Sequence, residues 1–125
     1  MSYVRRYTAS QAETASPERL MVLLFEKALA HMRTAAAALE AGRPAEAGLP
    51  IHKASQIVAE LARTLDDRRA PALAAPLRDT YRFVAQRLLA AGNERDPRAL
   101  REAERVFQPV AEAFSAAVAD AGAGA

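Results

Sequence analysis

Apolar residues recur at helical spacing along most of the chain, and prolines and glycines divide the recurrences into segments. Ser16 can cap a helix, Pro17 suits its first position, and Gly42 suits the residue after its end. Between them an apolar stripe alternates steps of four and three residues, through Met21, Phe25, Ala28, Met32, Ala35 and Leu39. This spacing predicts a first helix from Pro17 to about Ala41 that packs nearly antiparallel in a bundle.

The linker that follows contains Pro44, Gly48 and Pro50. Because a proline inside a helix costs about 3 kcal/mol, we expect one helical turn and then a main second helix that begins at Pro50. This helix should end around residues 66–69. Its predicted buried face consists of Ile51, Ala54, Ile57 or Val58, Leu61 and Leu65.

Prolines also mark the last two predicted helices. Pro71 and Pro76 predict a short first turn and then a main helix over residues 76–91, which Gly92 and Asn93 close. Its stripe is Leu77, Tyr81, Val84 and Leu88. A cap and a proline at residues 96–97 open a fourth helix, which should reach about residue 120. Its stripe is Leu100, Ala103, Phe107, Val110, Phe114 and Ala117, and Pro109 inside it should bend the helix or remove one hydrogen bond.

No segment shows the alternating β-branched residues of a strand. We therefore expect an all-α protein, an elongated antiparallel four-helix bundle over residues 17–120. A short N-terminal arm with an extra helical turn should occupy residues 1–16, and a disordered tail should occupy residues 121–125.

Composition and charge narrow the function classes. The 125 residues suffice for one domain, and the lack of cysteine excludes disulfides and thiolate chemistry. No apolar run approaches the roughly 20 residues of a membrane span, and the N-terminus lacks a secretory signal, so we expect a cytoplasmic protein without stable membrane insertion. The net charge is only +2, and arginines alternate with acids, as in residues 101–105. This pattern is typical of a solvated helix face and disfavours a nucleic-acid partner.

Candidate catalytic groups are few. His31 and His52 are the two histidines, and neither lies in the Glu-x-x-His pair of a di-iron bundle. His31 fits the edge of the first seam. His52 raises the alternative of a phosphotransfer domain, but Lys53 follows directly and would point about 100° away on a helix. The chain also lacks a glycine-rich phosphate loop and a nucleophile elbow. We predict no enzymatic activity, no catalytic residue, no cofactor and no metal.

The first helix has more apolar residues than one buried face needs. Residues 20–25 form an unbroken apolar run, although a helix with a single buried stripe would leave about half of them polar. Val22 and Leu23 should lie beside or opposite the seam. Three kinds of segment would shield these side chains from water: local loops, the N-terminal arm with Tyr7, or a segment of a partner protein.

Several blocks of the sequence resemble the flagellar export chaperone FliS family. The segment YTASQAETASPERL, residues 7–20, is similar to the start of that family, in which a tyrosine precedes E-T-A-S-P-E-x-L. The resemblance continues through residues 53–61, 77–83 and 96–104, so it spans nearly the whole chain. The sequence departs from the family pattern at residues 25–27, at residues 70–71 and at Phe114, where the family has a tryptophan.

This resemblance implies a chaperone that binds the C-terminal segment of unpolymerised flagellin in the cytoplasm. Binding would prevent premature polymerisation and aid delivery to the flagellar type III export gate. It also implies that the N-terminal arm, with Tyr7, can cover an apolar cleft when no client is bound. A non-catalytic adaptor for another secretion substrate or flagellar regulator is the alternative within the same class.

Candidate client-contact residues come from the arm and three predicted helices. Tyr7 is the candidate cover, and each of the others could equally belong to the core. The other candidates are Val22, Leu23, Ile51, Ile57, Val58, Tyr81 and Phe83.

Overall fold

The computed structural model describes residues 16–66, 68 and 71–124. They form four α-helices and one short 3-10 helix, in the order α2 (Pro17–Glu40), η1 (Pro44–Glu46), α3 (Gly48–Arg63), α4 (Pro71–Glu94) and α5 (Pro97–Gly124). No strand occurs in these described ranges. The prediction of an all-α fold is therefore confirmed, whereas residues 1–15 of the predicted arm lie outside the described residues.

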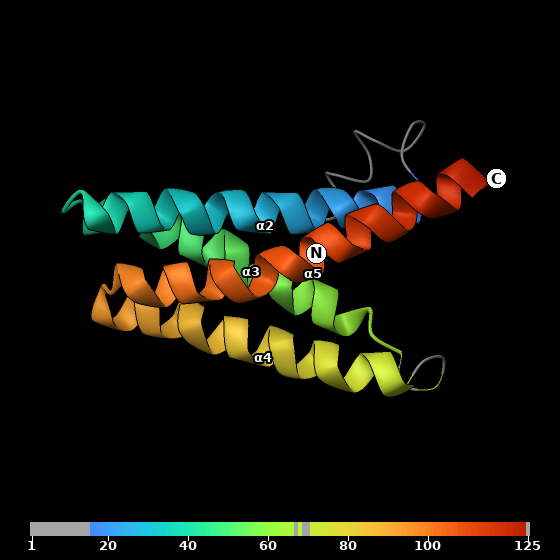
Figure 1. The fold of residues 1–125 in the computed structure, drawn as a ribbon. Helices are drawn as coiled ribbons and strands as arrows, with labels where there is room; N and C mark the ends of the chain where they lie inside the picture. Colours follow the sequence, from blue (N-terminus) through green and yellow to red (C-terminus); the bar gives the residue numbers. More distant parts are fainter. Residues whose placement is uncertain (1–15, 67, 69–70, 125) are drawn as a thin grey trace.

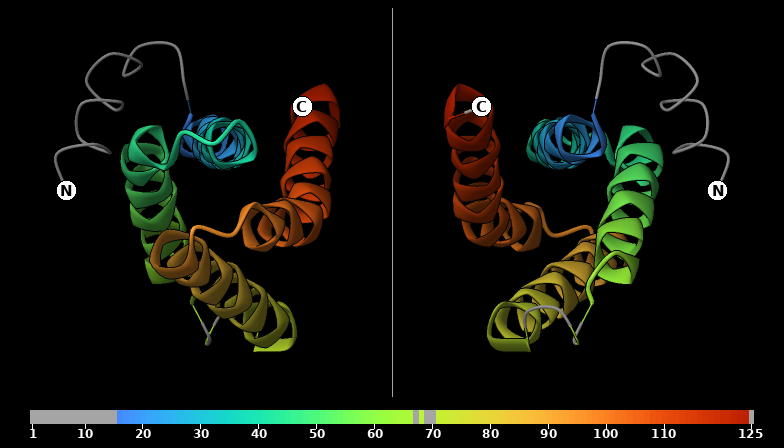
Figure 2. Two further views of the ribbon diagram at one scale, coloured as in Figure 1. Left: turned by 90° about the vertical axis from the view of Figure 1, so that its left-hand side faces the viewer. Right: turned by 90° about the vertical axis from the view of Figure 1, so that its right-hand side faces the viewer.

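The helices form an elongated bundle in which successive helices run antiparallel (Figure 1). α2 packs against α3 and α5, and α4 packs against the same two helices from the other side. This is the predicted four-helix arrangement. Seen along the bundle, α4 and the second half of α5 diverge (Figure 2). One end of the bundle is therefore more open than the other.

Both ends of α2 follow the sequence prediction. Ser16 Oγ accepts a hydrogen bond from the backbone N–H of Arg19 at 3.2 Å, which caps the first turn. At the other end Gly42 adopts φ 74°, and Arg43 donates its N–H to the carbonyl of Ala38 at 2.8 Å. Gly42 itself donates to Leu39 at 3.1 Å, which completes a Schellman motif.

The predicted limits of the second helix were wrong at both ends. α3 already begins at Gly48 rather than at Pro50, because Pro50 stands in the first turn, where its missing N–H has no intrahelical acceptor anyway. The one helical turn expected before it is η1. α3 ends at Arg63, before the predicted residues 66–69. The N–H groups of Thr64 and Leu65 bond to carbonyls three residues back, at 3.1 Å and 3.3 Å, so the α-helical pattern stops there.

The break predicted at Pro76 was also wrong. α4 runs without interruption from Pro71 to Glu94 with Pro76 inside it. Pro76 and Ala72, whose carbonyl loses its helical partner, are both exposed, so water can bind that carbonyl. Gly92 does not close the helix either. The chain instead reverses at Arg95, which has φ 53°.

α5 begins as predicted at residues 96–97. Asp96 Oδ1 accepts a hydrogen bond from the N–H of Arg98 at 3.0 Å, the same device that starts α2. The helix continues to Gly124, beyond the predicted end at residue 120, while the domain division itself stays a prediction. α5 changes direction between its first and second halves (Figures 1 and 2), where Pro109 lacks the N–H of a regular helix.

The core is a cluster of apolar residues from all four helices. Phe25 of α2 lies at its centre, with ring centroids 5.2 Å from Phe107 and 5.4 Å from Phe114 of α5, and 6.5 Å from Tyr81 of α4. Small alanines such as Ala28 let the helices approach closely. The largest fully buried side chains are Phe25, Met32, Ile57, Val58, Leu61, Val84, Leu88, Leu100 and Phe107.

Candidate functional site

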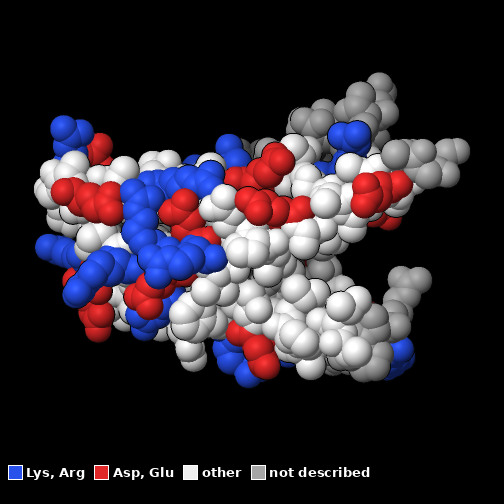
Figure 3. Space-filling model, viewed as in Figure 1, with Lys and Arg blue, Asp and Glu red and all other residues white. Residues whose placement is uncertain are grey.

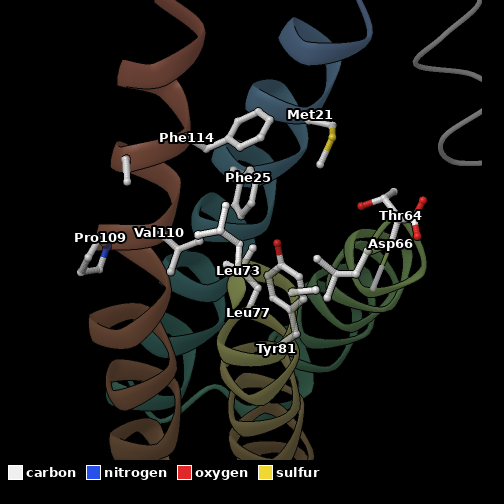
Figure 4. Close-up of a pocket in the computed structure, with 13 residues that line it drawn as sticks. Met21, Phe25, Thr64, Asp66, Leu73, Leu77, Tyr81, Pro109, Val110 and Phe114 are labelled. Atoms are coloured by element: carbon white, nitrogen blue, oxygen red, sulfur yellow. The ribbon is translucent and has the colours of Figure 1, made fainter. Parts of the chain in front are cut away.

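A pocket of about 620 Å³ opens between the start of α4 and the part of α5 that follows Pro109. All four helices or their ends contribute to it, and its lining is almost entirely apolar (Figure 4). The lining residues are Met21, Phe25, Thr64, Leu65, Asp66, Leu73, Ala74, Leu77, Tyr81, Pro109, Val110, Ala113 and Phe114. Apolar concavities with a few polar groups are the usual form of binding sites.

The shape of the pocket follows from the divergence of α4 and α5. The second half of α5 leans away from α4 after Pro109, and the surface is hollowed between these two helices (Figures 2 and 3). Side chains around the hollow are mostly uncharged, whereas charged residues gather over the opposite end of the bundle. Leu73 stands on the α4 wall with 67% of its surface exposed. An apolar side chain this exposed at a concave site indicates a surface for an apolar partner.

Three of the described residues that line the pocket are polar. The Thr64 hydroxyl donates to the Leu61 carbonyl, and Asp66 Oδ1 accepts the N–H of Arg68 at 2.9 Å, so both bond within their own turn. Tyr81 lies deeper and is 4% exposed, and its hydroxyl points into the pocket in Figure 4. Burial raises the pKa of Tyr81 to about 12, so the phenol stays protonated at neutral pH.

Of the predicted contact residues that the structure describes, one lies in the pocket. Tyr81 lines it, while Phe83 points elsewhere on α4 with 38% of its surface exposed. Ile57 and Val58 are buried in the core, and Ile51 is half-buried against it. Val22 and Leu23 are half-buried on α2 outside the pocket, and Tyr7 lies outside the described residues. Among the described candidates, Tyr81 is therefore the residue that lines the pocket.

Several lining residues were absent from the predicted contact set. Leu73 and Leu65 flank the α3–α4 connection, and Val110 and Ala113 follow Pro109 on α5. The sequence did contain a signal for Val110 and Phe114, because both continue the apolar stripe of the fourth helix beyond Pro109. Nothing in the pattern of the short first turn predicted before Pro76 indicated that Leu73 would face a cavity.

The two histidines do not form a reactive site. His31 is half-buried, and its Nε2 atom has no hydrogen-bond partner among the described residues. Burial, together with the charges of Lys27 and Lys53, lowers its pKa. His52 is exposed on α3. Over the described residues no group of three or more histidine, aspartate or glutamate side chains is placed to hold a metal ion. None of the described helices is both long and apolar enough to cross a membrane.

The fold and the site together define an all-helical bundle protein with an apolar pocket at one end. The family described as "Flagellar protein FliS" matches residues 1–121. The flagellar secretion chaperone FliS of Salmonella typhimurium strain LT2 is 30% identical over 114 residues, which cover 90% of this chain and 84% of that protein. The flagellar secretion chaperone FliSB of Pseudomonas aeruginosa PAO1 is 32% identical over 101 residues, 81% of this chain and 80% of that protein.

This chain belongs to the FliS family of flagellar secretion chaperones. The family is not catalytic, so the chain is a chaperone and not an enzyme. Its partner is a flagellar substrate. The resemblance on which the prediction rested is thereby confirmed.

Proposed function

We propose that this protein binds the C-terminal segment of unpolymerised flagellin in the cytoplasm, prevents its premature polymerisation and aids its delivery to the flagellar type III export apparatus. The observation that carries the proposal is the apolar pocket between α4 and α5 in a chain of the FliS family. The two relatives are named as flagellar secretion chaperones, which supports an export substrate as the client.

The pocket suits a segment that folds on binding. An amphipathic segment places apolar side chains at i, i+3 and i+4, and such a row fits a groove walled by Leu73 and Leu77 on one side and Val110 on the other. Ordering a free segment costs entropy, which a large buried apolar area must offset. Holding of this kind needs neither a nucleotide nor a metal.

Calorimetric titration with flagellin encoded by the same genome tests the proposal. Intact flagellin should bind, and flagellin that lacks its C-terminal segment should not. Absence of binding by intact flagellin would overturn the proposal and favour the adaptor for another secretion or regulatory partner. Binding that survives the deletion would overturn the proposed mode.

A matched pair of substitutions tests whether flagellin contacts the pocket. Leu73 and Leu89 both lie on α4 and are 67% and 65% exposed, but only Leu73 lines the pocket. Leu73→Asp should weaken flagellin binding roughly tenfold or more, because it puts a charge into the apolar groove. Leu89→Asp should leave the dissociation constant unchanged. Equal effects of the two substitutions would move the binding surface away from the pocket.

The arm belongs to the same proposal. We propose Tyr7 as a cover of the apolar surface in the absence of client, and Val22 and Leu23 as additional contacts on α2. Tyr7→Ala should alter the dissociation constant for flagellin while the free energy of unfolding changes little. A large loss of stability without a change in affinity would mean that Tyr7 is a core residue.

A further inference from the structure

The phenol of Tyr81 is held in one orientation by its neighbours. Its ring packs between Phe25 and Phe107, with centroids 6.5 Å and 6.3 Å away, and only 4% of the residue is exposed. Figure 4 shows the hydroxyl oxygen directed into the cavity, not into the core. A client segment seated in the pocket would therefore meet this oxygen in a fixed position.

The Tyr81 hydroxyl is also the uncommitted donor of the pocket. Thr64 already donates to Leu61, and Asp66 is an acceptor that Arg68 occupies. Within the described part of the chain, Tyr81 makes no hydrogen bond of its own. Because the phenol holds its proton far above neutral pH, it is available as a donor under physiological conditions.

The surroundings restrict the kind of acceptor that can meet this donor. Among the described residues no lysine or arginine lines the pocket, and the Asp66 carboxylate stands at its margin. A carboxylate of the client would therefore lie beside another acid and without a cation from these residues. The backbone carbonyls of a helical segment are occupied by their own i+4 N–H groups. A neutral carboxamide side chain has a free carbonyl oxygen and carries no charge.

We propose that Tyr81 is a specificity-determining residue of this chaperone, which donates a hydrogen bond to an asparagine or glutamine side chain that the bound segment inserts among apolar neighbours. This inference rests on the proposed function, since it assumes that the client segment occupies the pocket. The hydrogen bond requires a polar side chain at one position of the client segment, in addition to the apolar side chains that fit the groove. A segment with only apolar groups at this position would leave the phenol buried and unpaired, and the chaperone would bind it more weakly.

The test compares Tyr81→Phe with the wild type in calorimetric titrations of a peptide from the C-terminal segment of the flagellin encoded by the same genome. Tyr81→Phe keeps the ring and its packing, so the thermal midpoint should stay close to that of the wild type at neutral pH. The dissociation constant for the peptide should rise roughly tenfold. Thr80→Val is the matched control, because the Thr80 hydroxyl lies on the same helix, bonds to the Pro76 carbonyl at 3.0 Å and does not line the pocket, so the affinity should not change.

Peptide variants identify the acceptor. Each asparagine is replaced by leucine and each glutamine by methionine, one at a time, and every variant is titrated against both proteins. One replacement should weaken binding to the wild type roughly tenfold and have little further effect with Tyr81→Phe. Equal affinity of wild type and Tyr81→Phe, or the absence of any coupled replacement, overturns this inference while the proposed function stands. Failure of the wild type to bind the unmodified peptide overturns both.

Discussion

Arg101 of α5 binds Glu40 at the end of α2 through two hydrogen bonds, 2.8 Å from Nη2 to Oε1 and 3.0 Å from Nε to Oε2. Its remaining nitrogen, Nη1, donates to Glu104 at 3.0 Å, and the other oxygen of Glu104 accepts from Arg33 at 2.7 Å. Four alternating charges thus join α2 to α5 at the end of the bundle opposite the pocket. The network fixes the first half of α5, whose second half forms one wall of the pocket, against α2.

Glu104→Gln should lower the free energy of unfolding by about 1 kcal/mol at neutral pH, because it weakens two charge-assisted hydrogen bonds. Desolvation alone would raise the pKa of Glu104, but the bonds to Arg33 and Arg101 outweigh it and the pKa is lowered from 4.5. The stabilisation is therefore present above pH 4.5 and is lost as the pH falls through the lowered value. Urea unfolding of both proteins across this range measures it.

Glu94 supplies the control for this prediction. It is exposed at the end of α4 and forms no ion pair with another described residue. Glu94→Gln should therefore leave the stability within the error of the measurement. A loss as large as that of Glu104→Gln would mean that general charge balance, and not the network, sets the effect.

Tyr81 should make the fold sensitive to alkaline pH. Its pKa is about 12 in the folded protein and 10.0 without the burial, so the folded state holds the proton more tightly. The stabilisation is full below pH 10 and is lost as the pH rises from 10 to 12. Urea unfolding should show a steeper loss for the wild type than for Tyr81→Phe over this interval. Parallel curves for the two proteins would contradict the burial of the phenol.

Two glycines should respond in opposite ways to alanine. Gly92 lies inside α4, and a Cβ atom there would be 3.9 Å from Cγ2 of Ile51, an ordinary contact. Gly92→Ala should therefore raise the free energy of unfolding by about 0.5 to 1 kcal/mol. Gly42 has φ 74°, so Gly42→Ala should lower it by about 1 kcal/mol. Thermal unfolding measures both, and a gain from Gly42→Ala would contradict the left-handed turn after α2.

Pro109 should matter more for binding than for folding. Pro109→Ala restores an N–H that can bond to the Arg105 carbonyl, and a straighter α5 would shift Val110 and Phe114 relative to α4. The affinity for flagellin should fall by about 1 kcal/mol, roughly fivefold in the dissociation constant. Pro76→Ala is the control, since Pro76 is exposed and does not line the pocket. Unchanged affinity for Pro109→Ala would show that the bend does not shape the pocket.

The sequence predicted the number and order of the helices because apolar stripes mark each helix, and the starts of α2 and α5 also have a local chemical cause. Ser16 and Asp96 cap α2 and α5 as expected, and Gly42 takes the left-handed conformation that ends α2. The apolar stripes also predicted which faces are buried, as Met32 and Leu88 illustrate. These features depend on neighbours along the chain, so the sequence contains them directly.

The helix limits near prolines could not be predicted in the same way. The cost of an interior proline depends on whether the freed carbonyl can reach water, which is a property of the folded surface. Pro76 lies on an exposed face, and α4 therefore passes through it. Pro50 falls within the first turn of α3, where the loss of its N–H has no consequence.

The candidate site was predicted only in part for a related reason. Periodicity identifies an apolar face but does not separate a core position from a groove position. Val58 and Tyr81 both lie on such faces, yet Val58 is enclosed by the bundle and Tyr81 opens onto the pocket. What distinguishes them is the divergence of α4 from α5, which depends on packing between segments distant in the sequence.

The separation of charge and apolar surface between the two ends of the bundle gives them opposite responses to dissolved salt. Added salt screens the exposed ion pairs around Arg101 and so lowers their contribution to the stability of the charged end. Salts that are excluded from protein surfaces favour the burial of apolar area, so they should raise the affinity of the pocket for a client. A change in the ionic composition of the cell would therefore change the stability of the chaperone and its affinity for the client in opposite directions.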